Sequence, residues 1–335
     1  MRTTTVSGRT WSFSHSLGAF STEGKGFLHP TDVAVAPDGV LYVVSRGQFA
    51  TMDSIQSRDR LRITKLTIEE EFISEFATGH FSWPAGLALD SQGNLYCSDE
   101  RDNLIHVYSP DGEKLDAWGR KGAGQGQFSG PCGLGFDGAD TLHVVDTFNH
   151  RVQRFTRDGA SLGSWGSAGV DPGQFDRPWG VTIDENGDVY VADWGNNRVQ
   201  KFAPDGSFLM SIGSVSYGGE LNHPADVAVD SQGDVYVTDW GNKRVQIYDA
   251  AGEVLTALYG DAMEFSQWGR LKMEGNEEVA KAYARVEDLS PLGKFDRPRG
   301  IAIDERDRVV VVDSTRCRLQ VYAKEDGYTD PELNL

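Results

Sequence analysis

The sequence has few cysteines, and the three that it has cannot all pair within one chain. They are Cys97, Cys132 and Cys317. An odd number leaves at least one thiol free, and reduced thiols are typical of cytosolic proteins. We therefore expect a cytoplasmic protein whose fold does not depend on disulfides.

Positive charge is scarce as well. The 335 residues include 32 Lys and Arg against 50 Asp and Glu, so the formal net charge is −18. Such a surface repels phosphate backbones, which argues against a nucleic-acid partner. No apolar run is long enough to cross a bilayer, and residues 1–8 lack the apolar core of a signal peptide, so no membrane partner is expected.

What the sequence does contain is a repeated phrase. Each copy has a proline, a short apolar run, an Asp/Gly turn and a second apolar run, and the clearest copies end in Arg-Val-Gln. The prolines are Pro30, Pro84, Pro131, Pro178, Pro224 and Pro298, and the middle intervals are 47, 47 and 46 residues. A period in the forties with four short strands per unit is typical of propeller blades.

The repeat predicts an all-β fold, a six-bladed β-propeller formed by residues 1–335 as a single domain. The expected blades start near residues 28, 82, 129, 176, 222 and 296. The last unit lacks its outer strand, and the spacing of the segment 13–18 matches that of the outer strand 208–213. We therefore expect residues 9–20 to close the ring by pairing with the last blade, which removes an open sheet edge.

Two stretches break the period. Residues 46–60 lengthen the loop between the second and third strands of the first unit, and residues 261–294 separate the fifth unit from the sixth. The second stretch is rich in good helix formers between residues 274 and 286, which predicts a short helix. Both loops should leave the same face and wall one side of the central opening; the alternative is two unrelated loops that tolerate extra length.

Repeated polar residues are interpreted as structural. An Asp precedes the turn in five units, and an Arg follows it five residues later in four of them; the Asp residues are Asp99, Asp146, Asp193, Asp239 and Asp313. An Asp at this position can accept turn N–H bonds, and the Arg can pair with a carboxylate.

Residues on either side of each proline are expected to face the central channel, and they differ between units. The second residue after the proline is Asp32 in the first unit and Asp226 in the fifth, where the others have Gly. Two carboxylates among backbone groups suit a hard cation, Ca²⁺ above all. The alternative is that both only bond backbone N–H groups of the adjacent blade.

Other groups near the prolines permit different chemistry. His29 and His223 could bind a transition metal instead, although no third ligand is evident. Cys132 could be a nucleophile, but no base is identifiable and a buried inert thiol is more common.

Aromatic and cationic residues vary from blade to blade near the same opening. Phe148, Trp179, Trp194 and Trp240 could form an aromatic floor, with arginines as cationic points: Arg46, Arg101, Arg299 and Arg316. On so acidic a chain, arginines around an apolar hollow suit a small anionic molecule. The alternative is that the tryptophans pack between blades.

The phrase at residues 189–200, Val-Tyr-Val-Ala-Asp-Trp-Gly-Asn-Asn-Arg-Val-Gln, resembles the NHL repeat. Within that group the chain distantly resembles peptidyl-hydroxyglycine amidating lyases, because the segment 41–47 looks like the one that carries an active-site arginine there. The resemblance implies an arginine role for Arg46 and a channel calcium near Asp32 and Asp226. That family's zinc histidines are missing after the prolines, so the amidating reaction itself is not expected.

Two functions follow from this reading. The first is a lyase or hydrolase, of the lactonase or amidating-lyase kind, acting on a small anionic metabolite. Arg46 and Arg299 would hold the anion, and His29 or His223 would move a proton. The alternative is a non-catalytic scaffold that binds a protein or peptide on the same face.

Overall fold

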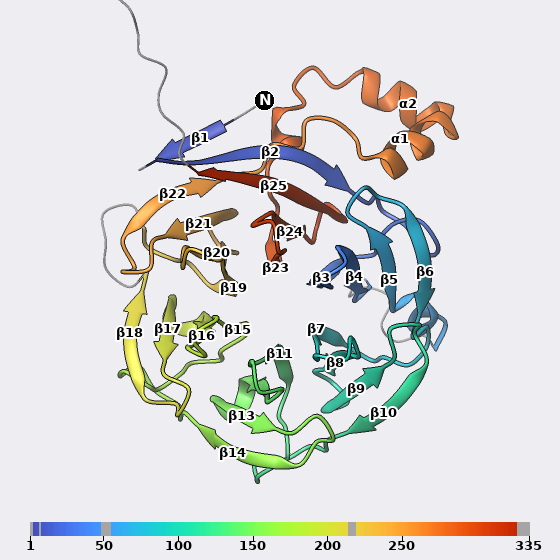
Figure 1. The fold of residues 1–335 in the computed structure, drawn as a ribbon. Coiled ribbons are helices and arrows are strands. Elements are labelled where there is room, and N and C mark those ends of the chain that lie inside the picture. Colours follow the sequence, from blue (N-terminus) through green and yellow to red (C-terminus); the bar gives the residue numbers. More distant parts are fainter. Residues whose placement is uncertain (1–2, 7, 48–54, 214–218, 327–335) are drawn as a thin grey trace, which may run out of the picture.

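The computed structural model describes residues 3–6, 8–47, 55–213 and 219–326. Six antiparallel sheets stand around a central channel, one sheet per blade, so the chain is a six-bladed β-propeller (Figure 1). Within the described residues, no helix is long and apolar enough to cross a membrane.

Blades one to five each use four consecutive strands, with the first strand nearest the channel. Blade one contains β3 (Pro30–Val35), β4 (Val40–Ser45), β5 (Arg62–Thr67) and β6 (Phe72–Phe76). Blade two contains β7 (Pro84–Leu89), β8 (Leu95–Asp99), β9 (Leu104–Tyr108) and β10 (Lys114–Trp118). Blade three contains β11 (Pro131–Phe136), β12 (Leu142–Asp146), β13 (Arg151–Phe155) and β14 (Ser161–Trp165).

The second half of the ring repeats this order. Blade four contains β15 (Val181–Ile183), β16 (Val189–Asp193), β17 (Arg198–Phe202) and β18 (Phe208–Ile212). Blade five contains β19 (Pro224–Val229), β20 (Val235–Asp239), β21 (Arg244–Tyr248) and β22 (Val254–Leu258). Blade six contains β23 (Pro298–Ile303), β24 (Val309–Asp313) and β25 (Arg318–Asp326), and its fourth strand comes from the other end of the chain.

That fourth strand is β2 (Arg9–Leu17), which pairs antiparallel with β25, and β1 (Thr3–Val6) adds a fifth strand outside it. The predicted ring closure is therefore confirmed. Trp11 is fully buried on the neighbouring blade, and its Nε1 donates to the Tyr236 hydroxyl at 2.8 Å. The Lys324 ammonium, on β25, is buried against Asp230 and Asp234 of blade five. The Trp11 contact fixes the closing strand to blade five, and the Lys324 ion pairs fix β25 to the same blade.

The hydrophobic core lies between neighbouring blades rather than at the centre. Tyr42 and Ile63 of blade one, for example, share a buried cluster with Leu87 and Leu95 of blade two. This arrangement follows from the fully buried pattern of the second strands, which have an apolar neighbour on both faces. It leaves the centre to side chains that do not build the core.

The recurring Asp and Arg hold each blade together. In blade four, Asp193 Oδ1 accepts the Asp176 N–H at 2.8 Å, while its Oδ2 accepts from Asn196 and Arg198 at 2.8 and 2.9 Å. Gln200 donates to the same Oδ2 at 3.1 Å. The carboxylate thus joins the entry loop to the second and third strands, in agreement with its structural interpretation.

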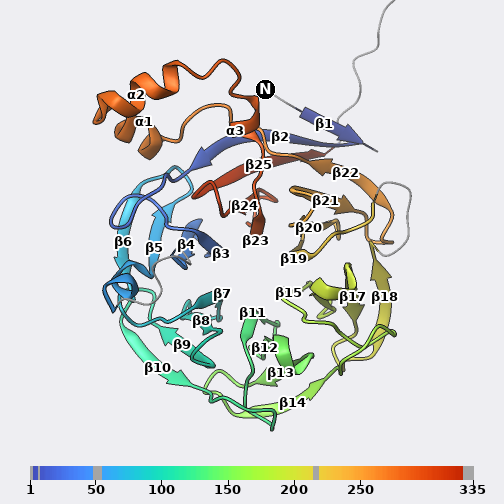
Figure 2. The ribbon, with the colours of Figure 1, turned by 180° about the vertical axis from the view of Figure 1, so that it is seen from behind.

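The helical insertion lies outside the ring. It contains α1 (Gln267–Glu274), α2 (Glu277–Ala284) and α3 (Ser290–Gly293). Both views show α1 and α2 beyond β2, at the outer rim where blade six meets blade one (Figures 1 and 2). The helical content of this insertion was predicted. The prediction that the insertion forms a wall beside the central opening was wrong, because α1 packs on the outer strands. In the first insertion, η2 spans Ile55–Arg60, and residues 48–54 lie outside the described part of the chain.

Candidate functional site

The central channel is a cavity of about 350 Å³ lined by the innermost strands. The residue directly after each proline lines it, as predicted; these residues are Thr31, Ala85, Cys132, Trp179, Ala225 and Arg299. The following position, occupied by Asp or Gly, lines it as well. Most of the wall is therefore backbone or small apolar side chains, and Arg299 is the one strong positive charge among the described residues that line it.

The residues before the prolines do not line this cavity, so that part of the prediction was wrong. His29, Arg177, His223 and Arg297 have φ of 47°, 50°, 55° and 60°. This left-handed backbone is uncommon for residues with a side chain. It turns the chain into the inner strand, so the side chain before the proline lies outside the channel, where it meets residues from the loops of neighbouring blades.

These contacts between neighbouring blades follow one pattern. The residue after the second strand of one blade packs on the residue before the proline of the next blade. The guanidinium carbon of Arg46 lies 4.2 Å from the centroid of the Trp83 ring, and that of Arg297 lies 5.2 Å from the centroid of the Trp240 ring. The ring centroids of Trp194 and His223 lie 4.1 Å apart. The tryptophans therefore contribute to inter-blade packing, while remaining partly exposed at the face.

Further contacts join these pairs into an arc around the channel mouth. The Trp179 ring stacks on Trp194 with 5.2 Å between centroids, and the Arg299 guanidinium lies 4.9 Å from the Trp179 centroid. Arg177 covers the Trp194 ring at 4.8 Å. We call the set Arg299, Trp179, Trp194, His223, Trp240 and Arg297 the aromatic–arginine arc. A flat apolar group with a negative charge would find both a stacking surface and cations along it.

Near this arc, Arg46 is the charged side chain with the least favourable surroundings. Its side chain is only 8% exposed, and Glu100, at 2.7 Å, is its one carboxylate partner among the described residues. Burial and the nearby positive charge of Arg299 lower the pKa of Arg46 to about 9. Its Nε has no hydrogen-bond partner among the described residues. A buried guanidinium so incompletely neutralised favours the arrival of another anion.

His223 has a defined orientation. Its Nδ1 lies 2.6 Å from Asn222 Oδ1, and an amide oxygen can only accept a hydrogen bond, so Nδ1 carries the proton. In the neutral ring, Nε2 then keeps a free lone pair, as a general base requires. Burial and, to a smaller extent, the charge of Arg297 lower the pKa of His29.

Asp32 and Asp226 connect blades. Asp32 Oδ2 accepts the Leu87 N–H of blade two at 2.7 Å, and Asp226 Oδ2 accepts the Ile301 N–H of blade six at 3.1 Å. On the other side each carboxylate lies against a glycine. A Cβ at Gly180 would lie 2.1 Å from Asp226 Oδ1, so a larger residue there would displace the carboxylate.

The two carboxylates are protonated more readily than usual. Protein surrounds each of them where it faces the narrow channel, and this burial raises the pKa of Asp32 to about 7 and that of Asp226 well above its ordinary value. Hydrogen bonds from backbone N–H groups and the charge of Arg299 oppose the rise.

These features decide how well the channel residues could bind a metal ion. Within the described ranges, no three His, Cys, Asp or Glu residues come together as a metal cluster. Each Asp already accepts backbone N–H bonds, and the Arg299 guanidinium is close enough to affect both. This donor set does not fit a bound cation well, and no step of chemistry is assigned to one. Calcium at Asp32 and Asp226, and a transition metal at His29 and His223, stay predictions.

The thiols are not placed for nucleophilic chemistry. All three cysteines are free, and Cys97 and Cys317 are buried. Burial, with a smaller effect from Glu100, raises the pKa of Cys132 to about 12, so it is a thiol at neutral pH. This agrees with its interpretation as an inert group in the channel wall.

Three predicted binding residues lie apart from the arc. Phe148 is 53% exposed and covers Gly130. A Cβ added at this glycine would lie 2.5 Å from the Phe148 ring. Arg101 is exposed. Arg316 lies beside the helical insertion, where it donates to the Pro291 carbonyl.

Sequence reasoning left Trp83, Glu100, Arg177, Asn222 and Arg297 without a role. All but Asn222 occupy the two loop positions that vary between blades, next to the prolines and after the second strands. The pairing of one position with the other in the next blade was the signal that could have assigned them.

Comparison with known proteins agrees with this architecture. A model of the NHL repeat matches residues 175–202, 221–248 and 295–322. A search of curated proteins gave no match. The chain carries NHL repeats on a six-bladed propeller.

Several solved structures share the fold. One is a protein of unknown function from Bacteroides thetaiotaomicron, with 15% identity, coverage of 95% of this chain and 76% of its own, and a TM-score of 0.64. A streptogramin B lyase has 11% identity over 94% of this chain and 98% of its own, with a TM-score of 0.57. A catalytically inactive virginiamycin B lyase from Staphylococcus aureus, solved with quinupristin, has 12% identity over 93% and 99%, with a TM-score of 0.56. At these identities the likeness concerns the fold.

Proposed function

We propose that this NHL-repeat propeller binds a small anionic molecule with a flat apolar part at the channel mouth, and acts on it as a lyase or hydrolase. The observation that carries the proposal is Arg46. It is a buried guanidinium beside a second one, Arg299, with a single carboxylate partner within the part of the chain that the structure describes, in a chain of net charge −18. An anion placed between the two arginines would relieve their repulsion.

The aromatic–arginine arc supplies the remaining recognition. Trp179 and Trp194 are stacked with an interplanar angle of 24°, so the parts of the two rings that stay exposed form an apolar surface next to Arg299. A planar substituent on the anion would lie against them while its charge meets the guanidinium groups. Substrates that lack either part should bind more weakly.

His223 would move the proton. In an elimination its Nε2 would take a proton from the carbon next to the carboxylate, and Arg46 and Arg299 would stabilise the negative charge that develops. The electrons of the C–H bond would form a C=C bond, and the leaving group on the neighbouring carbon would depart with the electrons of its own bond. In a hydrolysis of a lactone the same Nε2 would take a proton from the attacking water, whose oxygen would bond to the carbonyl carbon. The ester C–O bond of the ring would then break, and the imidazolium would give the proton to the departing oxygen. Asn222 would act as a positioning residue, because its Oδ1 keeps the imidazole in the tautomer with Nε2 free. Lyases occur among the structures that share this fold, which supports the reaction class.

Binding can be tested with 2-naphthoate, a flat aromatic carboxylate, by its quenching of tryptophan fluorescence at the arc. We expect 2-naphthoate to bind at least about tenfold more tightly than the neutral 2-naphthylmethanol, because a charge-assisted contact contributes about 1.5–3 kcal/mol. Arg299→Gln should remove this difference. Arg306→Gln, which removes an exposed arginine elsewhere in blade six, should not. Equal binding of the two probes would refute the anion site.

Catalysis is tested separately. A panel of aromatic lactones and of carboxylates with a leaving group two bonds from the acid should contain a compound that is turned over. His223→Gln should then lower kcat while KM changes little. Binding of 2-naphthoate without turnover of any member of the panel would favour the alternative, a non-catalytic binding face.

A further inference from the structure

A second cavity lies at the outer rim, away from the channel. It has a volume of about 600 Å³ and lies between the end of the closing strand, the loop 262–266, the helices of the insertion and the edge of blade six. Its wall is mainly apolar, with the side chains of Phe20, Met263, Phe265, Met273, Val279, Tyr283 and Leu292. This size falls within the range of pockets that hold small organic molecules.

One side of the cavity is firmly attached to the propeller. Trp268 of α1 is buried against Phe27 and Phe72, with centroid distances of 5.9 and 6.2 Å. The buried Glu70 carboxylate accepts the Gly18 N–H at 2.6 Å and the Trp268 N–H at 3.2 Å. Helix α1 is therefore fixed to blade one and to the closing strand, so the cavity floor is preformed.

The opposite side depends on fewer contacts. Helix α2 meets α1, and its Tyr283 ring lies 4.6 Å from that of Phe265. Phe265 is 37% exposed and Val279 is 47% exposed. Methionine side chains on the wall are flexible and adapt to the shape of an apolar guest. The outer wall thus leaves large apolar side chains exposed to solvent where an apolar chain could cover them.

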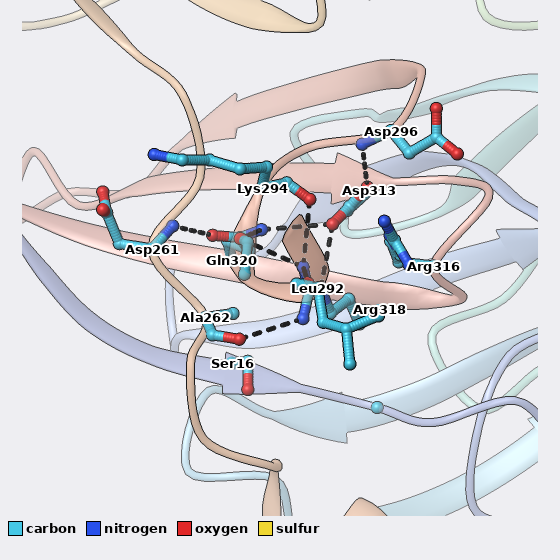
Figure 3. Close-up of polar contacts among 12 residues, drawn as sticks. Ser16, Asp261, Ala262, Leu292, Lys294, Asp296, Asp313, Arg316, Arg318 and Gln320 are labelled. Atoms are coloured by element: carbon cyan, nitrogen blue, oxygen red, sulfur yellow. Dashed lines mark hydrogen bonds and ion pairs between the residues drawn. The ribbon is translucent and has the colours of Figure 1, made fainter. Parts of the chain in front are cut away.

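The cationic side chains that line the cavity differ in how fully they are paired. Arg318 is fully engaged: its Nε pairs with Asp313 at 2.8 Å, and its other nitrogens donate to backbone carbonyls (Figure 3). Lys272 and Arg316 have no carboxylate partner among the residues that the structure describes, and each donates only to a backbone carbonyl, of Phe20 and Pro291. Arg316 Nε is buried without a hydrogen-bond partner in the same part of the chain.

The surroundings of Lys272 make its charge costly. Burial and the nearby charge of Arg62 lower the pKa of Lys272. Glu264 lines the cavity too, but no ion pair joins it to either cation within the described residues. An apolar cavity with two unneutralised cations suits a ligand that is apolar over most of its length and carries a negative charge at one end.

We infer that this cavity binds a free amphipathic anion, a carboxylate with an unbranched apolar tail, with Lys272 and Arg316 at the carboxylate and the apolar wall around the tail. The site is independent of the channel mouth, because none of its lining residues belongs to the channel or to the aromatic–arginine arc. Occupancy would attach α2 more firmly to the rim, since the tail would contact both helices.

Octanoate is the probe, and 1-octanol is its uncharged counterpart, each titrated by calorimetry into the full chain. We expect one octanoate per chain, bound about tenfold or more tightly than 1-octanol, since a charge-assisted contact gives a factor of this order. The double variant Lys272→Gln/Arg316→Gln should weaken octanoate about tenfold and leave 1-octanol unchanged. The matched control is Lys281→Gln, a lysine on α2 that is 55% exposed, paired with Glu277 and absent from the lining, and it should bind octanoate like the wild type.

A second pair of variants separates this site from the channel mouth. Met273→Glu places a carboxylate in the wall and should abolish octanoate binding while the circular dichroism stays that of the wild type. Arg46→Met should bind octanoate normally, whatever it does to 2-naphthoate. The inference is overturned by no octanoate binding at millimolar concentration, by equal binding of octanoate and 1-octanol, by a double variant that binds like the wild type, by loss in Arg46→Met, or by binding only of anionic lipid vesicles.

Discussion

Replacing Arg46 by Met should make the protein more stable and less able to bind an anion. Met has a similar length and no charge, so the substitution removes the guanidinium with little change in packing. It also removes the ion pair with Glu100 at 2.7 Å and the contact with the Trp83 ring at 4.2 Å. The outcome for stability depends on whether those contacts outweigh the cost of burying the charge.

The structure indicates that they do not. A pKa of about 9 in place of 12.5 corresponds to roughly 4–5 kcal/mol by which folding disfavours the charged form. The contact of Arg46 with Trp83 contributes about 1 kcal/mol, and Glu100, whose side chain is 26% exposed, loses about 1 kcal/mol at most with its partner. We therefore expect Arg46→Met to raise the free energy of unfolding by about 1–3 kcal/mol, and to weaken 2-naphthoate about 10- to 100-fold, the equivalent of about 1.5–3 kcal/mol.

Urea unfolding at pH 7, followed by circular dichroism, measures the first quantity, and tryptophan quenching measures the second. The matched comparison is Arg62→Met. Arg62 is also buried and ion-paired, with Glu75 at 2.9 Å, but its Nη atoms donate to backbone carbonyls, among them those of Thr22 and Gly26 at 3.0 Å. Its loss should cost about 3–5 kcal/mol. If Arg46→Met lowered stability by more than about 1 kcal/mol, Arg46 would be a structural clamp and the argument for an anion site would fail.

Four other outcomes are expected. Asp193→Ala leaves a buried arginine unpaired and should lower the unfolding free energy by about 3–5 kcal/mol, whereas the exposed turn Asp205→Ala should change it by less than about 1 kcal/mol; equal effects in urea unfolding would contradict the structural role. Because the pKa of Asp32 is raised to about 7, the folded state holds more protons than the unfolded state between about pH 4 and 7, so wild-type stability should fall relative to Asp32→Asn as pH rises through this range; a gap independent of pH would exclude the raised pKa. Trp11→Ala removes a buried ring of the closing strand and should cost about 3–5 kcal/mol, and a loss under about 1 kcal/mol would mean that closure adds little. Metal analysis of the purified protein tests the calcium prediction: about one calcium per chain, lost in Asp32→Ala, would establish it, and its absence from both would remove it.

The blades were predictable because their pattern is local and is repeated. Each blade predicted from the repeat is present as a sheet, since alternating apolar runs and Asp/Gly turns specify strands without distant contacts. The closing strand was found by the same means, because Phe13 and its neighbours copy the spacing of an outer strand that the last unit lacks.

The site was predictable only in part. The residues after the prolines were placed correctly in the channel because they begin the innermost strand. The residues before them were misplaced, because the left-handed backbone at positions such as His223 and Arg297 is not visible in the residue type. The helical insertion was likewise recognised as helix, but its place at the rim depends on Trp268 packing against Phe27 and Phe72, which are distant in the sequence.

The sequence by itself determined the number of blades, the strands of each and the way in which the ring closes. These depend on short-range patterns that six copies repeat, so no long-range contact needed to be known. The tertiary structure decided which of the variable residues meet. Arg46 stands next to Arg299, and Trp194 next to His223, because ring closure brings different blades to one opening, and the energy of those charges and rings depends on distances that no single repeat contains.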